Sequence, residues 1–155
     1  MPDQACTITR RNNATEKEGI QHLESLNAGF FFVDKDERRR ILELLEQLKN
    51  FSRSFDMVLI PRLAGAELTL GAIETHIGEL TLIELKCTRT FLPNNPKGFF
   101  FGATQNEFDF GERLGDKFRF CFVCLNPESP SHATLTVPEL ETKIRTRRIQ
   151  YQINL

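Results

Sequence analysis

The chain contains no tryptophan and only one tyrosine, and its net charge is only −1 at pH 7. Near-zero charge argues against a protein that clamps nucleic acid by bulk electrostatics, although it leaves room for a local basic edge. No apolar run approaches the ~20 residues that span a membrane, and residues 1–13 lack the apolar core of a secretory signal. We therefore expect a cytoplasmic protein with no membrane partner.

Cysteine and histidine are also scarce, with four and three copies in 155 residues. Cys121 and Cys124 have the spacing of a zinc motif, but they lie in an apolar run, where residues at that spacing on a strand point to opposite faces. The chain has no second motif of this kind. The sequence therefore argues against zinc and favours reduced thiols in the core.

Hydrophobic periodicity predicts one domain in which helices and strands alternate. Residues 1–20 are polar and are expected to form a flexible N-terminal segment, which leaves residues 21–155 as the single domain. The predicted elements are, in order, a helix over 37–50, strands over 56–61, 67–75 and 80–90, a helix over 104–114, a strand over 117–125, a charged segment over 137–148 and a last strand over 149–155. This order predicts an α/β fold in which helices flank a mixed sheet.

The most informative stretch is an otherwise apolar strand that carries Glu84 and Lys86. These two side chains share one face of the strand, whereas Ile83, Leu85 and Cys87 share the other. A buried charge pair needs compensation, and a bound metal ion would compensate it and also do chemistry. The alternative is an exposed charge pair on a solvated face of the sheet.

A second acid is expected beside this pair, but the sequence leaves its identity open. The strands over 67–75 and 80–90 are expected to form an antiparallel hairpin with a glycine near its tip. If His76 faces Glu79 in that hairpin, Glu67 lies on the same face as Glu84. A slip of one residue would bring Glu74 to that face instead.

Two predicted helices begin with the pattern of a capping box, and the acid of the first one has a second interpretation. Asp34 is followed by Glu37, and Thr104 is followed by Glu107, at the spacing of a capping box, in which each side chain binds the other residue's backbone N–H. Glu37 also lies on the inward stripe of its predicted helix. It therefore either caps the helix or points at something cationic inside the fold.

Several short motifs in a fixed order resemble one superfamily of enzymes. They are Gly65-Ala66-Glu67, Ile83-Glu84-Leu85-Lys86-Cys87-Thr88, Thr104-Gln105-Asn106-Glu107 and Asp116-Lys117-Phe118-Arg119-Phe120. Together with Glu37 at a helix start, they resemble the PD-(D/E)xK nuclease superfamily, and most closely the C-terminal domain of NO VEIN-type proteins, which are relatives of Mrr-like restriction endonucleases. The likeness covers residues 35–155. It implies a restriction-endonuclease-like mixed sheet flanked by helices, with an αβββαβ core.

This resemblance implies metal-dependent hydrolysis of phosphodiester bonds in DNA. Glu67, Glu84 and the backbone carbonyl of Leu85 would hold Mg²⁺ or Mn²⁺. Lys86 would orient or deprotonate the attacking water and stabilise charge on the phosphate. Glu37 would hold a metal-bound water or a second ion.

The same resemblance implies supporting roles around that centre. Asn106 and Glu107 would be supporting groups, Thr88 and Arg89 would meet the phosphate backbone, and Arg38 belongs to a basic cluster that would attract DNA if it lined the cleft. Nucleases of a single domain commonly need two copies to cut both strands, so a homodimer is compatible with this interpretation. The alternative function is a catalytically inactive nuclease-fold module that binds nucleic acid or a protein partner.

Overall fold

The fold is built on a five-stranded sheet in the order β1-β2-β3-β4-β5. The computed structural model describes residues 4–155, and side chains from residue 14 onward. The strands are β1 (Phe30–Phe32), β2 (Met57–Leu59), β3 (Thr81–Thr88), β4 (Phe118–Cys124) and β5 (Ser131–Leu135). The helices are α1 (Gln4–Ser25), α2 (Lys35–Leu44), α3 (Leu70–His76), α4 (Gln105–Leu114) and α5 (Val137–Glu141), with short 3-10 turns at Lys49–Arg53, Pro61–Leu63 and Gly115–Lys117.

The sheet is mixed, with β3 at its centre. β1 is antiparallel to β2, and β2 is antiparallel to β3. Met57 of β2 lies opposite Ile83 of β3. β4 then pairs in parallel with β3, and β5 returns antiparallel to β4. The prediction of an α/β fold with a mixed sheet flanked by helices is confirmed.

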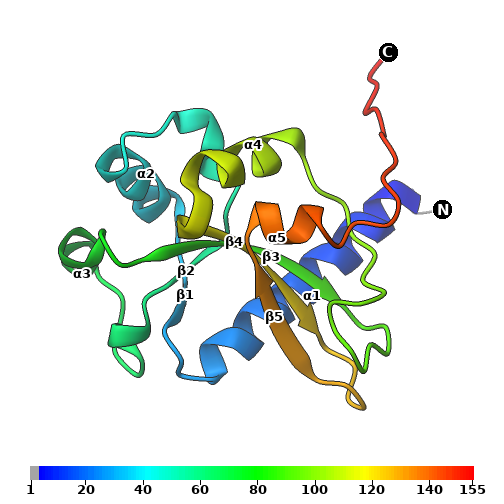
Figure 1. The fold of residues 1–155 in the computed structure, drawn as a ribbon, viewed down its shortest axis with the longest axis horizontal. Coiled ribbons are helices and arrows are strands. Elements are labelled where there is room, and N and C mark those ends of the chain that lie inside the picture. Colours follow the sequence, from blue (N-terminus) through cyan, green and yellow to red (C-terminus); the bar gives the residue numbers. More distant parts are fainter. Residues whose placement is uncertain (1–3) are drawn as a thin grey trace.

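The two faces of the sheet carry separate hydrophobic cores. On one face, α1 packs Leu23 against Ile83 and Leu85 of β3. On the other face, α2, α4 and α5 cover a larger core that contains most of the buried phenylalanine rings, among them Phe110 and Phe120. Figure 1 shows α1 behind the sheet and α5 in front of it. In the described part of the chain, no helix is long and apolar enough to cross a membrane.

Two glycines allow helices to approach the strands closely. A Cβ atom on Gly19 of α1 would collide with the sulfur of Cys87, and one on Gly111 of α4 would collide with Val137. Any larger residue would therefore push its helix away from the sheet or from α5. The approach at Gly19 brings α1 next to β3, the strand that carries the candidate site.

Most of the segment over residues 1–20, which the sequence predicted to be flexible, is helical in the described structure. Residues 4–20 belong to α1, and residues 1–3 lie outside the described part. The helix is polar along most of its length, so it lacks a broad apolar stripe. Gly19, Ile20 and Leu23 nevertheless provide a narrow contact face that holds it on β3.

The predicted strand over 67–75 is wrong, and with it the predicted hairpin. Residues Leu70–His76 form α3, which begins where the Thr69 hydroxyl accepts a hydrogen bond from the Ala72 N–H at 3.0 Å. His76 and Glu79 meet at 2.6 Å within one turn and not across two strands. The antiparallel partner of β3 is β2, as the pairing of Met57 with Ile83 shows. Residues 67–75 therefore do not lie opposite Glu84.

Candidate functional site

Glu84 and Lys86 form the centre of a buried charged cluster on the α4 side of β3. Glu84 is only 7% exposed. The Lys86 ammonium donates to Glu84 Oε1 at 3.2 Å and to Glu107 Oε1 at 2.7 Å. One cation therefore bridges two buried carboxylates, one from the strand and one from the helix that covers it. The alternative of a solvated charge pair does not apply, because both side chains lie beneath α4.

Glu107 is held in place by the start of α4. The predicted capping box is present: the Glu107 N–H donates to the Thr104 hydroxyl, and the Thr104 N–H donates to Glu107 Oε2. One carboxylate oxygen thus fixes the helix start and the other fixes Lys86. Burial opposes the charge on Glu107, but contacts with Glu84, Lys86 and the Thr104 N–H outweigh it and lower the pKa of Glu107 to about 2.

Asp56 brings a further carboxylate to this centre. It directly precedes β2, and its N–H donates to the Ile83 carbonyl at 2.8 Å. Its Oδ2 atom accepts a hydrogen bond from the Leu85 N–H at 2.9 Å. Continuing the register of Met57 with Ile83 by one residue places Asp56 opposite Glu84. The sequence prediction missed Asp56, although it starts the run that was correctly expected to be a short strand.

Glu84 is poorly stabilised as an anion. Burial, a hydrogen bond with Glu107 and the negative charge of Asp56 raise the pKa of Glu84 well above its ordinary value, and Lys86 only partly offsets them. Its Oε2 atom is buried and has no hydrogen-bond donor. The contact with Glu107 is therefore a hydrogen bond only when Glu84 carries a proton. Once Glu84 ionises, one of its oxygens faces no donor at all.

Glu16 joins the cluster from helix α1, which covers the face of the sheet opposite α4, and it reaches Asp56. Burial, the charge of Asp56 and a hydrogen bond with Asp56 raise the pKa of Glu16 to about 7, against the opposing charges of Lys86 and Arg38. Glu16 was missed because residues 1–20 were expected to be flexible. Arg38, which was predicted to bind nucleic acid, lies close enough to influence Glu16, and it donates to the Ser52 carbonyl at 3.4 Å.

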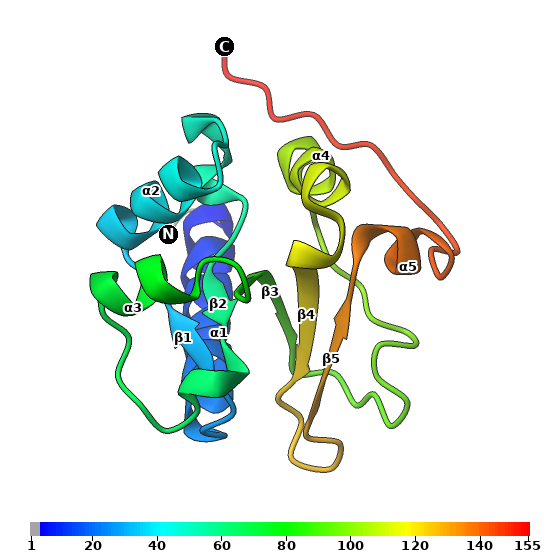
Figure 2. The same cartoon turned by 60° about the vertical axis from the view of Figure 1, so that its left-hand side comes forward.

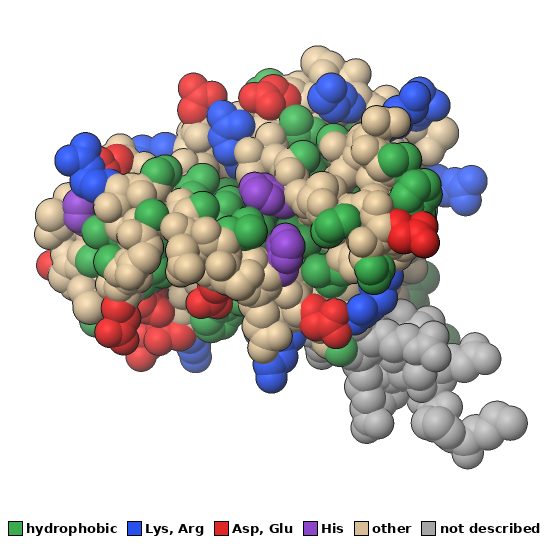
Figure 3. Space-filling model, turned by 90° about the horizontal axis from the view of Figure 1, so that it is seen from below, with side chains coloured by type: hydrophobic (Ala, Val, Ile, Leu, Met, Phe, Trp, Pro, Cys, Tyr) green, Lys and Arg blue, Asp and Glu red, His purple; other side chains and the backbone are tan. Residues whose placement is uncertain are grey.

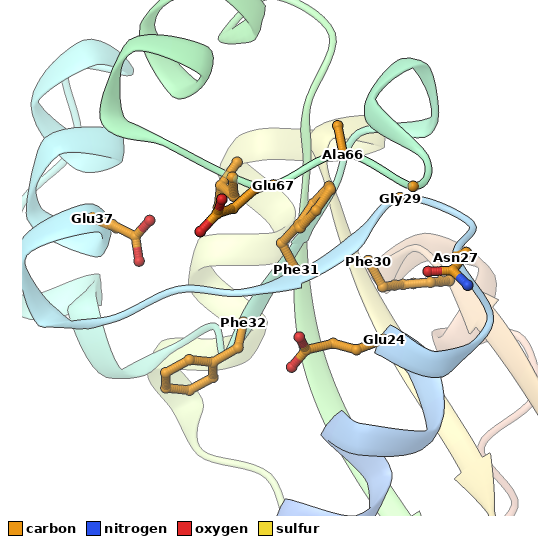
Figure 4. A pocket seen from close by; sticks show the side chains of 11 residues that line it. Glu24, Asn27, Gly29, Phe30, Phe31, Phe32, Glu37, Ala66 and Glu67 are labelled. Carbon is orange, nitrogen blue, oxygen red and sulfur yellow. The ribbon is translucent and has the colours of Figure 1, made fainter.

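Two of the predicted acids lie elsewhere. Glu37 and Glu67 face a surface pocket of about 440 Å³ that runs along β1 (Figure 4). Glu37 caps α2, since its Oε1 accepts from the Asp34 N–H at 3.0 Å, as the capping reading expected. Glu74 lies on α3, where it pairs with Arg40 at 3.0 Å. Because the predicted hairpin does not form, no described contact joins Glu67 or Glu74 to Glu84.

The remaining predicted residues lie at the rim of the cluster or outside it. The Thr88 hydroxyl accepts from the Thr90 N–H at 3.2 Å, and exposed Arg89 pairs with Glu18 of α1 at 2.7 Å. Asn106 is exposed on the first turn of α4. Leu85 buries its side chain on the α1 face. Because the N–H and C=O of a strand residue point to the same side, its carbonyl is directed to the edge where Asp56 lies.

Two histidine side chains lie side by side on the face seen in Figure 3, apart from the acidic groups there. His132 of β5 packs edge-on against the Phe30 ring at 5.7 Å. Burial and the nearby His22 lower the pKa of His132. Among the described side chains, which begin at residue 14, no group of three or more Asp, Glu, His or Cys residues is arranged to hold a metal ion. The smaller set of Asp56, Glu84 and a carbonyl is the candidate that the geometry offers.

Comparisons with known proteins give no relative: no family model, no curated protein and no solved structure matches the chain. The arguments about function therefore rest on the geometry of this cluster.

Proposed function

We propose that the protein is a metal-dependent nuclease that hydrolyses phosphodiester bonds in DNA, with Mg²⁺ or Mn²⁺ held by Asp56, Glu84 and the Leu85 carbonyl. The observation that carries the proposal is the buried Glu84 Oε2 atom, which has no hydrogen-bond partner. An unsatisfied buried polar atom costs about 1–3 kcal/mol. A hard divalent cation beside the carboxylate would remove that penalty, and oxygen atoms are the ligands that such ions prefer.

The side chains around this set suit phosphodiester hydrolysis. A bound ion would polarise the phosphate and acidify a water molecule. Lys86, held by Glu107, would place its ammonium beside the phosphate and stabilise the negative charge that develops there. Glu16, next to Asp56 and with a pKa of about 7, is suited to accept the proton of the attacking water near neutral pH.

The order of the elements also supports the proposal. The chain passes through α1, three strands that are each antiparallel to the next (β1, β2 and β3), α4 and a strand parallel to β3. This order is compatible with the αβββαβ core that the sequence resemblance implies, with α2, α3, β5 and α5 as additions and with α1 and β1, which precede residues 35–155, as its first helix and strand. Asp56 would take the role expected for Glu67, since it is the acid that lies opposite Glu84 and directly precedes β2. Arg38 and Arg89 remain the candidates for contact with the DNA backbone.

A non-catalytic module is the second candidate, and one observation favours it. The side chains of Lys86 and Glu84 are only 13% and 9% exposed. Lys86 also neutralises part of the acidic charge by itself. In this alternative, the cluster would hold β3 and α4 together, and the surface of the same fold would bind nucleic acid or a protein.

Cleavage of supercoiled plasmid DNA with Mg²⁺ or Mn²⁺ tests the proposal. The native chain is expected to cut, and Asp56→Asn, Glu84→Ala and Lys86→Ala are each expected to lower the rate by about 10²-fold or more. Glu67→Gln is the matched control, an acid outside the cluster, and it should keep native activity. Equal activity in all variants, or no cleavage together with no effect of Mg²⁺ on thermal unfolding, would favour the non-catalytic module.

A further inference from the structure

The segment after α5, residues 142–155, carries a strand pattern that the fold leaves unused. Its apolar residues alternate with polar ones and are highly exposed: Ile149 80%, Tyr151 78%, Ile153 79% and Leu155 115%. Alternation of this kind is typical of a strand with one buried face. The sequence predicted a strand here, yet the described structure pairs this segment with none of the five strands. The pattern therefore points to a partner outside the chain's own sheet.

The segment is anchored at its start and free beyond it. Arg147 binds Glu141 Oε2 at 2.7 Å, and its guanidinium lies 5.1 Å from the centre of the Phe108 ring of α4. Figure 2 shows the segment passing α4 and leaving the body of the molecule. In Figures 1 and 2 its end lies above the body of the molecule and is separated from β1. The anchor thus directs residues 149–155 away from the chain's own β1.

The first strand of the sheet offers a free edge to such a segment. β1 is the outermost strand on its side. Gly29 and Val33 use their backbone groups to bind Ile60 and Asp56 at the β2 side. By alternation, the N–H and C=O groups of Phe30 and Phe32 point outward. An open edge of this kind is a template for another strand.

Charge distinguishes the β1 edge from the β5 edge. The pocket along β1 is lined by Glu24, Glu37 and Glu67 and by no basic side chain (Figure 4). The residues that lead into the free segment are basic, with Lys143, Arg145, Arg147 and Arg148 in six positions. The β5 strand, Ser131–Leu135, instead carries no acidic side chain. The acidic pocket therefore matches the basic segment, and the β5 edge does not.

We propose that two copies of this chain form a dimer by exchanging residues 142–155. Residues 149–155 of one copy pair as a strand with β1 of the second copy, and Lys143, Arg145 and Arg148 meet the carboxylates of the pocket, while Arg147 keeps its anchor on Glu141. Because each copy has one such segment and one such edge, a twofold exchange satisfies both and closes the assembly. The proposal is independent of the nuclease proposal.

The oligomeric state of the full chain tests this exchange directly. Light scattering and sedimentation at micromolar concentrations are expected to show a dimer that weakens as salt is added, because charge pairs contribute to it. The double variant Tyr151→Asp/Ile153→Asp should raise the dissociation constant at least about tenfold. The matched control, Gln150→Asp/Gln152→Asp, adds the same charge to the opposite face of the same segment and should leave the dimer intact.

Charge reversal tests the receiving edge. Glu67→Arg should weaken the dimer, and combining it with Arg148→Glu should restore part of the loss. Hydrogen exchange should protect Phe30–Phe32 and residues 149–155 in the dimer and lose that protection in the Tyr151→Asp/Ile153→Asp variant. Several outcomes would overturn the proposal: a monomeric native chain, a dimer that neither double variant weakens, equal weakening by both, or a monomer in which the segment is already protected.

Discussion

Replacing Glu84 by glutamine tests whether this side chain is present for the fold or for a ligand. Glu84 is 7% exposed, and its Oε2 atom has no donor. Burial, Glu107 and Asp56 raise the pKa of Glu84 well above its ordinary value. Glutamine keeps the shape and removes the charge, and its amide N–H can donate to Glu107 as the protonated acid does. We therefore expect Glu84→Gln to stabilise the metal-free protein.

The expected size follows from the contacts. Providing a hydrogen bond for one unsatisfied buried polar atom raises the free energy of unfolding by about 1–3 kcal/mol. Loss of the charge-assisted hydrogen bond to Lys86 lowers it again by part of that amount. Lys86 still keeps its 2.7 Å bond to Glu107, so no ammonium is stranded. We expect a net gain of about 1–2 kcal/mol near neutral pH, which raises the Tm by about 2–8 °C for a chain of this length.

The gain should depend on pH. An acid whose pKa is raised by folding binds its proton more tightly in the folded state, so the native protein loses stability as pH rises above the unfolded pKa of Glu84. The advantage of glutamine is therefore small near pH 5 and grows toward pH 8.

Calorimetric unfolding in EDTA and in Mg²⁺ measures both effects. If Glu84 holds the ion, the native chain should gain about 2.7 kcal/mol at a Mg²⁺ concentration one hundred times the Kd, and Glu84→Gln should gain far less. Glu128→Gln, a substitution in an exposed loop, is the control and should change stability by less than about 0.5 kcal/mol. A Glu84→Gln protein that is less stable than the native chain in EDTA, yet still stabilised by Mg²⁺, would refute this reasoning.

Three further predictions follow from the same contacts. Lys86→Met leaves two buried carboxylates without their cation and should destabilise the fold by about 3–5 kcal/mol near neutral pH in urea titrations, with a smaller loss near pH 5. Glu16→Gln should flatten the fall in Tm that the native chain shows as pH rises from 4.5 to about 7, since the raised pKa of Glu16 favours the folded state only while the proton is bound. Gly19→Val would press a side chain against Cys87 and should cost about 1–3 kcal/mol, measured by denaturant unfolding.

Features that depend on nearby residues were predictable from the sequence. Both capping boxes are present, because a cap needs only a suitable pair three positions apart. Glu84 and Lys86 share a face for the same reason, since strand geometry alone decides it.

Features that depend on distant parts of the chain were not predictable in this way. Asp56 lies opposite Glu84 only because β2, and not residues 67–75, pairs with β3. That choice is made by burial of Met57 and Val58 in the two cores, which no local pattern encodes. Glu16 was hidden because the helix that carries it has a contact face too narrow to produce a clear periodic signal.

The cluster as a whole has more acid than base, and this imbalance yields a last prediction. The pKa values of Glu16 and Glu84 are both raised, so each carboxyl keeps its proton to a higher pH than an ordinary carboxyl does, and a nearby cation would favour loss of that proton. Binding of Mg²⁺ near neutral pH should therefore release protons, and the affinity should fall as pH falls from 8 to 6. Titration calorimetry in two buffers of different ionisation enthalpy measures this release, which should be smaller in Glu16→Gln. An affinity that is independent of pH, with the same heat in both buffers, would mean that the ion binds away from these carboxylates.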